Sequence, residues 1–499
     1  MKIVFVSSEL APLAQSGGLG DAVAGLARAL GAAGHQVTCV VPGYQSALRH
    51  PRCPPLFDRG PMALRFFPDD GRPFEVNGRL IGGRLGPGVD VVFVDLPTLY
   101  DRAGLYGDHT GGYGDNGLRF IALGRAGAYF AEATRPDVVV AHDWHAGLTV
   151  AALRTSLARG PVCGIGTVQV VHNNAYQGRF PSSCLALTGL ARDVFHPDGV
   201  ESWGELNLLK AGVAFADRIV AVSPTYAHEI QTPGCGEGLD GLYRARAHRL
   251  RGIVNGIDTA RFDPSTDQAL AQTYSSRDPT GKAVCRRELL RELGLDAPPP
   301  GRLVAGIGRL AAQKGWDVLA LAINGLVERG CSVALLGDGD PELARLLRER
   351  ARAWPRRVAF VAGFDEARSR RLYAGADVVL VPSRFEPCGL VQLIAQRYGS
   401  VPVAHATGGL IDTIRAPMTR VPAGDDDDDA WRDATGCLFS PLTAQALVEA
   451  VDRVAALGQS GRLPEVQRRL MGKDVSWDAP ARAWSAVISE VGAEARARM

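Results

Sequence analysis

The sequence repeats one pattern that few folds accommodate: a short apolar run, a polar or glycine-rich loop, and then a helical pattern. The first example is residues 2–7 (KIVFVS), followed by the loop QSGGLGD at 15–21 and by helical apolar spacing over 23–30. Runs that are apolar at every position are typical of strands buried on both faces of a parallel sheet. The pattern therefore predicts βαβ units.

The same rhythm continues through both halves of the chain. Further strands are expected at 35–42, 137–147 (running into a polar loop), 167–173, 218–223, 301–310, 332–337, 357–363, 377–383 and 401–406, with helices between them, including one at 316–330. This predicts an α/β protein of two doubly wound, Rossmann-like domains. The expected domains are residues 1–250, residues 251–475, and a C-terminal helix at 476–499 that packs back on the first domain, with 264–300 as a polar, Pro-rich connector inside the second.

Size and composition agree with two cores. The chain has 499 residues, 46% of them hydrophobic and 22% charged, and 499 residues exceed what one ordinary core holds. A net charge of +2 gives no field that favours nucleic acid or a membrane surface. The nine cysteines occur singly, without a CxxC pair, which favours reduced thiols and a cytoplasmic location. No apolar run approaches the ~20 residues that cross a bilayer.

In open parallel sheets, ligands bind beyond the carboxyl ends of the strands. The residues just past each strand are therefore the candidates for a site. If two such edges face each other, they form a deep cleft between the two domains, and this arrangement is the expectation here.

The second half supplies cations and a carboxylate at these positions. Arg309 and Lys314 follow the strand at 301–310, where two cations suit the charge of a diphosphate. The alternative is a pair of solvated loop cations. Glu386 follows the strand at 377–383 in "SRFEPCGL", where a carboxylate beside free backbone N–H groups can bind sugar hydroxyls; a first-turn helix-stabilising acid is the alternative. Thr407 and Gly408 repeat the design after the next strand.

The first half supplies Asp143 and His145 after one strand, and His172 and Asn173 after another. Two histidines and an aspartate could hold a metal. Binding of a polyhydroxylated ligand is the preferred interpretation, because these residues lie on separate strands and no HExxH or cysteine partner is present. The run of five aspartates at 425–429 is interpreted as a solvated loop.

Nine segments resemble one known family. They are "SSELAPLAQSGGLGD", "YGDNGLRF", "PDVVVAHDWHAG", "VHNNAYQG", "LLKAGVAFADRIVAVSPTYAHEI", "GIVNGID", "GRLAAQKGWD", "ADVVLVPSRFEPCGL" and "TGGLIDT". They are collinear and run nearly end to end. The chain thereby resembles the bacterial glycogen synthases and plant starch synthases, retaining glucosyltransferases of the GT-B architecture.

The resemblance implies transfer of glucose from ADP-glucose to the non-reducing 4-hydroxyl of an α-1,4-glucan such as glycogen, by front-face attack and without a metal or other cofactor. The residues it implies for catalysis are Asp143, His172, Arg309, Lys314 and Glu386. Together with the loops above, the expected substrate-binding residues are Gln15, Gly17, Gly18, Asp21, Asn255, Phe364, Cys388, Gly389, Leu390, Thr407 and Gly408. Phe364 is expected against the adenine.

The chain departs from the family at one informative place. Gln15 stands where these synthases usually have lysine, which removes one cation from the expected diphosphate side. Altered donor affinity, altered nucleotide preference (ADP- against UDP-glucose) and a weakened enzyme remain open, and Arg179 is a candidate for compensating charge. A glucan-binding or regulatory homologue with a weakened donor site is the alternative function, and a sugar-nucleotide hydrolase or epimerase is a further one.

Overall fold

The computed structural model describes residues 1–108, 111–363, 365–418 and 430–498. Phe364 and the aspartate run at 425–429 lie outside the described residues. The chain divides into two compact units. Unit 1 comprises Met1–Gly256 and Trp477–Met499, and unit 2 is Ile257–Ser476. The division falls after Gly256 rather than after residue 250, and the last helix belongs to unit 1.

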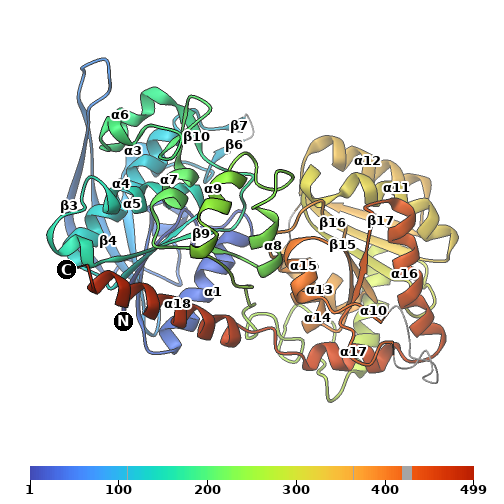
Figure 1. Ribbon diagram of the computed structural model, residues 1–499. Helices are drawn as coiled ribbons and strands as arrows, with labels where there is room; N and C mark the ends of the chain where they lie inside the picture. Colours follow the sequence, from blue (N-terminus) through green and yellow to red (C-terminus); the bar gives the residue numbers. More distant parts are fainter. Residues whose placement is uncertain (109–110, 364, 419–429, 499) are drawn as a thin grey trace. The chain divides into compact units, whose positions relative to one another are not determined.

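Unit 1 is built on a nine-stranded sheet in the order β14-β13-β9-β8-β1-β2-β5-β4-β3 (Figure 1). Its parallel strands are β1 (Lys2–Val6), β2 (Gln36–Pro42), β5 (Val89–Asp95), β8 (Val138–His142), β9 (Gly166–Val171), β13 (Arg218–Ala221) and β14 (Leu250–Gly252). Nearly every residue of β1, β8 and β9 is buried, as their apolar sequences predict.

Helices cover both faces of this sheet. α4 (Asn116–Thr134), α5 (Asp143–Arg154) and α7 (Leu208–Phe215) pack on one another on one face. On the other face α1 (Gly18–Ala32) packs beside α18 (Asp478–Arg496), which contacts β8 and β9. Figure 1 shows α18 in dark red running next to α1. The C-terminal helix therefore completes the core of unit 1.

Ion pairs hold α18 against the sheet of unit 1. The buried guanidinium of Arg218, on β13, reaches Glu490 and Glu494 of α18. Just past the helix, Arg498 Nη1 lies 2.7 Å from Oδ1 of Asp217. The buried Asp217 carboxylate also accepts hydrogen bonds from the Thr167 backbone N–H and hydroxyl. These contacts fix the helix to the β9–β13 side of the sheet.

Two features of unit 1 escaped the sequence patterns. β3 (Phe57–Phe66) and β4 (Phe74–Gly86) form an antiparallel hairpin that extends the sheet from β5. A separate three-stranded sheet joins β10 (Arg179–Pro181), β12 (Glu205–Asn207) and β11 (Glu201–Ser202). Most residues of the hairpin are exposed or half-buried, and the strands of the small sheet are only two or three residues long, so neither carries the continuous apolar run by which the buried strands were found.

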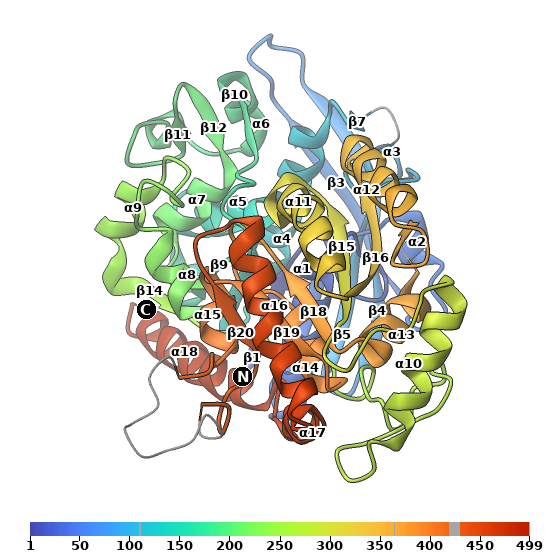
Figure 2. The ribbon, with the colours of Figure 1, turned by 90° about the vertical axis from the view of Figure 1, so that its right-hand side faces the viewer.

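Unit 2 is a six-stranded parallel sheet in the order β17-β16-β15-β18-β19-β20 (Figure 2). The strands are β15 (Leu303–Leu310), β16 (Ser332–Gly339), β17 (Val358–Ala362), β18 (Val378–Val381), β19 (Val401–His405) and β20 (Cys437–Phe439). The expected connector at 264–300 contains a helix, α10 (Thr280–Leu293), which packs on α13 (Glu366–Gly375). That part of the prediction was incomplete, because one polar face obscured the helical pattern.

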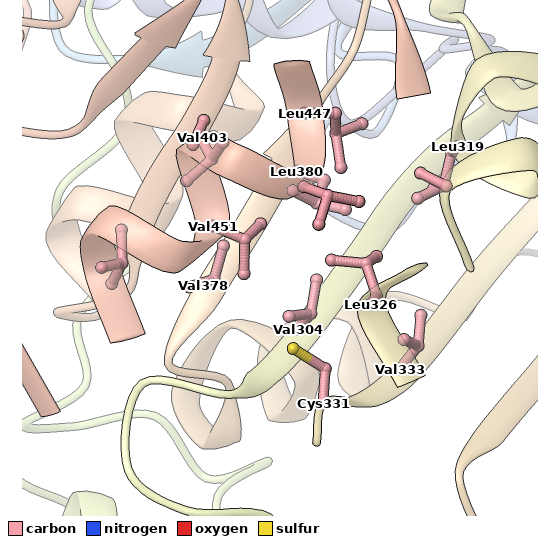
Figure 3. Close-up of a cluster of buried hydrophobic side chains, with 14 of the residues drawn as sticks. Val304, Leu319, Leu326, Cys331, Val333, Val378, Leu380, Val403, Leu447 and Val451 are labelled. Carbon is pink, nitrogen blue, oxygen red and sulfur yellow. The ribbon is translucent and has the colours of Figure 1, made fainter. Parts of the chain in front are cut away.

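One face of the unit 2 sheet carries a large apolar cluster. α11 (Trp316–Glu328) and α16 (Ala444–Gln459) pack on each other there, and the side chains of Val304, Leu326 and Val451 meet in the cluster (Figure 3). On the other face, α10, α13 and α14 (Val391–Arg397) cover a second cluster. The sheet is therefore buried on both sides.

Helix α11 offers a matched pair of leucines. Leu326 is fully buried, whereas Leu321 is 65% exposed. Leu326→Ala should destabilise unit 2 by about 2–5 kcal/mol, because it removes buried methyl groups and leaves a cavity. Leu321→Ala should change the free energy of unfolding by no more than about 0.5 kcal/mol. Scanning calorimetry of the full chain measures both, and equal midpoints for the two variants would contradict the placement of this helix.

Candidate active site

In each unit, later strands of the chain lie on both sides of the first strand, so the order of strands in the sheet reverses there. In unit 1, β1 pairs with β2 on one side and with β8 on the other. In unit 2, β15 pairs with β16 on one side and with β18 on the other. At such switch points the loops diverge to opposite faces and leave space beyond the carboxyl ends of the strands. Most of the expected site residues lie in the loops at or next to these two places.

In unit 2, Lys314 and Glu386 meet at the switch point. Lys314 lies after β15 and Glu386 after β18, and Lys314 Nζ is 2.7 Å from Glu386 Oε2. Glu386 is buried and also accepts a hydrogen bond of 2.8 Å from the Ser383 hydroxyl. The Lys314 side chain is 28% exposed and can still meet a ligand. Its charge is held in place by a buried carboxylate, which fixes its direction.

A close backbone approach sets the position of Lys314. Gly315 has a φ of 67°, and a Cβ on it would stand 1.9 Å from the carbonyl oxygen of Pro382. Only glycine allows the loop after β15 to lie this close to the end of β18. Arg309, at the end of β15, has an exposed side chain, and its carbonyl accepts a 2.8 Å hydrogen bond from the Trp316 indole.

The remaining expected residues of unit 2 line the adjoining loops. Cys388 and Thr407 are buried, and Gly389 and Gly408 have positive φ angles. The two loops are joined, because Gly409 N–H donates to the Glu386 carbonyl over 2.9 Å. Leu390 directly precedes α14. The segment around Glu386 is therefore held between the loops that follow β15 and β19.

In unit 1, helix α5 begins at Asp143 immediately after β8, without the polar loop that the sequence suggested. Asp143 has a φ of 55°, and its Oδ1 accepts hydrogen bonds from the backbone N–H groups of His172 (2.7 Å) and Asn173 (3.3 Å). Burial raises the pKa of the Asp143 carboxyl to about 7, against the effect of these two N–H groups. The carboxylate thus ties the end of β8 to the end of β9.

His142, the last residue of β8, was not among the predicted site residues. Its Nδ1 lies 3.0 Å from His172 Nε2. Burial lowers the pKa of both rings, that of His172 to about 3, so both are neutral at physiological pH. A neutral imidazole has one N–H, so one ring donates and the other accepts.

The tautomers of the two rings can be inferred from the second ring nitrogen of His142, which does not face His172. This atom, Nε2, is buried and has no hydrogen-bond partner among the described residues. A buried N–H without a partner costs more than an unfilled acceptor, as backbone groups show. This favours a proton on His142 Nδ1, donated to His172 Nε2. His172 then carries its proton on Nδ1, as a donor.

Glu9, which the sequence placed among the residues past the first strand without giving it a role, anchors the glycine loop. Its buried carboxylate accepts hydrogen bonds from the Ser16 backbone N–H (2.9 Å) and hydroxyl (2.6 Å). It also accepts a hydrogen bond of 2.8 Å from the Tyr106 hydroxyl. The sequence signal was an acid directly after a buried strand. Glu9 thus fixes the start of the loop in which Gly17 and Gly18 are exposed.

Gln15 is turned toward its own loop. Its Nε2 donates to Asp21 Oδ2 over 2.6 Å and to the Gly17 carbonyl over 3.1 Å. Asp21 lies in the first turn of α1. The neutral amide thus occupies the place beside Asp21, and the loop gains no positive charge from it.

Two other expected residues lie apart from these loops. Asn255 is half-buried, beyond the end of β14 at the edge of the unit 1 sheet. Arg179, the candidate for compensating charge, lies on β10, and its Nε is 3.8 Å from Glu205 Oε2. Its charge is therefore shared with an acid.

The described residues contain no group of three or more His, Cys, Asp or Glu side chains arranged to hold a metal ion. All nine cysteines are free thiols. Within the described ranges, every helix is too short or too polar to be a candidate membrane span.

Comparisons with known proteins agree along the whole chain. Residues 2–245 match the starch synthase catalytic domain, and residues 301–456 match the group 1 glycosyl transferases. The chain is 40% identical to the glycogen synthase of Myxococcus xanthus (strain DK1622), over 99% of this chain and 100% of that one. It is 42% identical to the glycogen synthase of Anaeromyxobacter sp. (strain Fw109-5), with the same coverage.

Solved structures give the same answer for the fold. The catalytic domain of starch synthase IV from Arabidopsis thaliana, bound to ADP and acarbose, matches with a TM-score of 0.86 and 28% identity over 99% of both chains. Sucrose-phosphate synthase from Thermosynechococcus elongatus matches with a TM-score of 0.61 and 19% identity, which bears on the fold alone. The two α/β units, each built on a mainly parallel sheet, and these matches define a glycosyltransferase of the GT-B class. Within that class, the chain belongs to the glycogen synthase family.

The raised pKa of Asp143 gives a stability prediction. A carboxyl whose folded pKa lies above its unfolded value of about 3.8 costs stability increasingly as pH rises from about 4 to about 7. Asp143→Asn keeps an oxygen that can accept from His172 N–H, tolerates the positive φ and removes the buried charge. The variant should therefore gain stability over the wild type across this pH window and keep a constant advantage above it. Urea unfolding at several pH values measures this, and a pH-independent difference would contradict the raised pKa.

Proposed function

We propose that this protein transfers glucose from ADP-glucose to the non-reducing 4-hydroxyl of an α-1,4-glucan, with retention of the anomeric configuration. The observation that carries the proposal is the Lys314–Glu386 pair at the switch point of unit 2, in a chain of the glycogen synthase family. The related starch synthase IV domain was solved with ADP and acarbose, which supports an ADP-linked donor and a glucan acceptor.

Arg309 and Lys314 bind the diphosphate in this proposal. As the glycosidic bond breaks, negative charge grows on the leaving phosphate, and fixed cations stabilise that charge more than the charge of the ground state. Glu386 holds Lys314 in place and lies beside the glucosyl or ribose hydroxyls. The loop from Cys388 to Leu390 offers backbone groups to sugar or phosphate, as do Thr407 and Gly408, and no metal ion is required.

Asp143 and His172 contact the transferred glucose. The tautomer inferred above makes His172 Nδ1–H a hydrogen-bond donor, which suits a hydroxyl oxygen of the sugar. Gly17 lies at the end of the loop that Glu9 anchors, and Gly18 and Asp21 lie in the first turn of α1. This loop and helix start offer backbone N–H groups to the donor phosphates. The acceptor hydroxyl attacks on the face from which the diphosphate leaves, so positioning and leaving-group stabilisation provide the rate enhancement.

The direct test incubates the purified protein with glycogen and with labelled ADP-glucose or UDP-glucose, and counts glucose incorporated into polymer. Incorporation from ADP-glucose is expected. Incorporation only from UDP-glucose would overturn the donor assignment. Absence of incorporation from either donor would favour a glucan-binding homologue, for which the neutral Gln15 is the one supporting observation.

Lys314→Ala should lower kcat about 10²–10³-fold, because it removes a cation that stabilises the leaving group. Arg345→Ala is the matched control, since Arg345 is an exposed cation paired with Glu342 and Glu349 on the surface of α12 (Pro341–Ala353). Steady-state kinetics and melting temperature should be measured for both variants. Near-normal turnover of a folded Lys314→Ala enzyme would contradict the assignment of Lys314 to the diphosphate.

Gln15→Lys should lower KM for the donor or raise kcat severalfold, because it places a positive charge beside the glycine loop. Gln15→Met keeps the length of the side chain without charge and should not reproduce the gain. If neither KM nor kcat responds to the lysine, the charge for the phosphates is supplied elsewhere.

A further inference from the structure

A tight turn in unit 1 carries an unexpected residue. β11 and β12 pair through Ser202 and Glu205, which leaves Trp203 and Gly204 as a two-residue loop. Their φ angles are 57° and 79°, the signs that a type I′ turn requires at both positions. Such turns favour Asn-Gly, and a bulky residue with positive φ is an outlier. The local backbone therefore gives no reason for a tryptophan here.

Burial gives no reason either. Trp203 is 80% exposed, more than any other large hydrophobic side chain in the described part of the chain. An indole in water contributes little to folding, and the left-handed backbone costs stability. Strain of this kind persists where it serves binding, at ligand clamps and similar sites.

The turn is nevertheless held in a defined position. Gly204 N–H donates to Glu201 Oε1 over 2.6 Å. The indole Nε1 lies 3.4 Å from the point that a Cβ on Gly238 would occupy, so the ring lies beside the loop of Glu237 and Gly238. Both of those residues also have positive φ, 51° and 81°. The exposed ring is thus presented by two tight turns that support each other.

Side chains near the candidate active site tie these two turns together. The buried Gln177 accepts from Asn207 Nδ2 over 2.7 Å, at the end of β12, and donates to the Glu237 carbonyl over 2.9 Å. Asn174 donates to the Gly236 carbonyl over 2.8 Å. Asn174 and Gln177 belong to the segment that directly follows His172 and Asn173, so one hydrogen-bonded network connects Trp203 with the end of β9.

We propose that the Trp203 indole is a stacking platform for glucose units of the α-1,4-glucan acceptor, a subsite outside the reaction centre. This rests on the proposed function for the identity of the ligand. A pyranose ring offers a C–H face that packs on an aromatic ring, while its hydroxyls need polar partners around the rim. Glu205 and Arg179, exposed on the same small sheet, can supply such partners. Figure 2 shows this sheet at the margin of unit 1, above α9 (Asp240–Ala245).

A glucan fits this surface better than a protein partner does. Protein interfaces are built around a contiguous apolar core. The two strands that flank the Trp203 turn carry Glu201 and Glu205, and the exposed Phe57, Phe67 and Phe74 lie on a different element, the β3–β4 hairpin. A single aromatic ring with a polar rim is suited to a sugar chain that touches the protein unit by unit.

The test replaces Trp203 by the residue that the turn itself favours. Trp203→Asn should melt at the same temperature as the wild type or higher, because asparagine tolerates positive φ. Its affinity for glycogen, measured by affinity electrophoresis without donor, should fall about tenfold. KM for glycogen should rise similarly, while kcat and KM on maltose, which is too short to occupy both the reaction centre and the platform, stay unchanged. Trp203→Phe keeps a ring and should retain part of the affinity.

Phe67→Ala is the control, because it removes a 62% exposed aromatic ring from the β3–β4 hairpin and should leave glycogen affinity unchanged. Unchanged glycogen affinity in Trp203→Asn would overturn the proposal. A lower melting temperature with reduced kcat on maltose would also overturn it, by showing a structural role. If Trp203→Asn loses glycogen affinity but the wild type incorporates no glucose from any nucleotide-sugar, the subsite stands and the proposed reaction fails.

Discussion

One constraint determines the arrangement of each unit: its first strand is hydrogen-bonded to two parallel strands, one on each side. The later strands of the chain are added outward from it on both sides. β1 lies between β2 and β8, and β15 lies between β16 and β18. The loops that leave β1 and β15 therefore meet loops that arrive from a distant part of the sequence. Lys314 and Glu386 come together for this reason. Next to the reversal in unit 1, Asp143 ties the end of β8 to the end of the neighbouring β9.

Acidic side chains are buried where these loops meet, whereas a solvated loop would leave them in water. Glu9 and Glu386 are buried carboxylates, each satisfied by neighbouring donors, and Asp143 is tied to two backbone N–H groups. Burying a carboxylate is costly unless hydrogen bonds or a cation compensate. Backbone N–H groups donate to Glu9 and Asp143, and the Lys314 ammonium and the Ser383 hydroxyl donate to Glu386. The contacts that position the loops therefore offset part of the cost of burial. Catalytic geometry and fold stability are coupled at these edges.

Apolar strands and glycine loops are local signals, and they predicted the two-domain α/β architecture. The GT-B class was implied by the resemblance to the glycogen and starch synthases. The sequence could not predict the β3–β4 hairpin or the Trp203 turn, since exposed strands and a tryptophan with positive φ follow no periodic pattern. His142 was missed, and Glu9 was given no role, for another reason. Their importance lies in contacts with His172 and Ser16, and those contacts exist only once strands are paired or a loop folds back. Gln15 was noticed because it departs from the family, but its bond to Asp21 was visible only in the structure.

The assignment of α18 to unit 1 has a consequence for biosynthesis. Unit 1 takes its strands from the first 256 residues and its final helix from Trp477–Met499, with all of unit 2 between them. During translation, β8 and β9 therefore lack their covering helix until residues 477–499 have emerged from the ribosome, while unit 2 can fold as soon as its own last helix emerges. The apolar face under α18 is exposed throughout that interval, which makes the nascent chain more prone to aggregation than the folded protein.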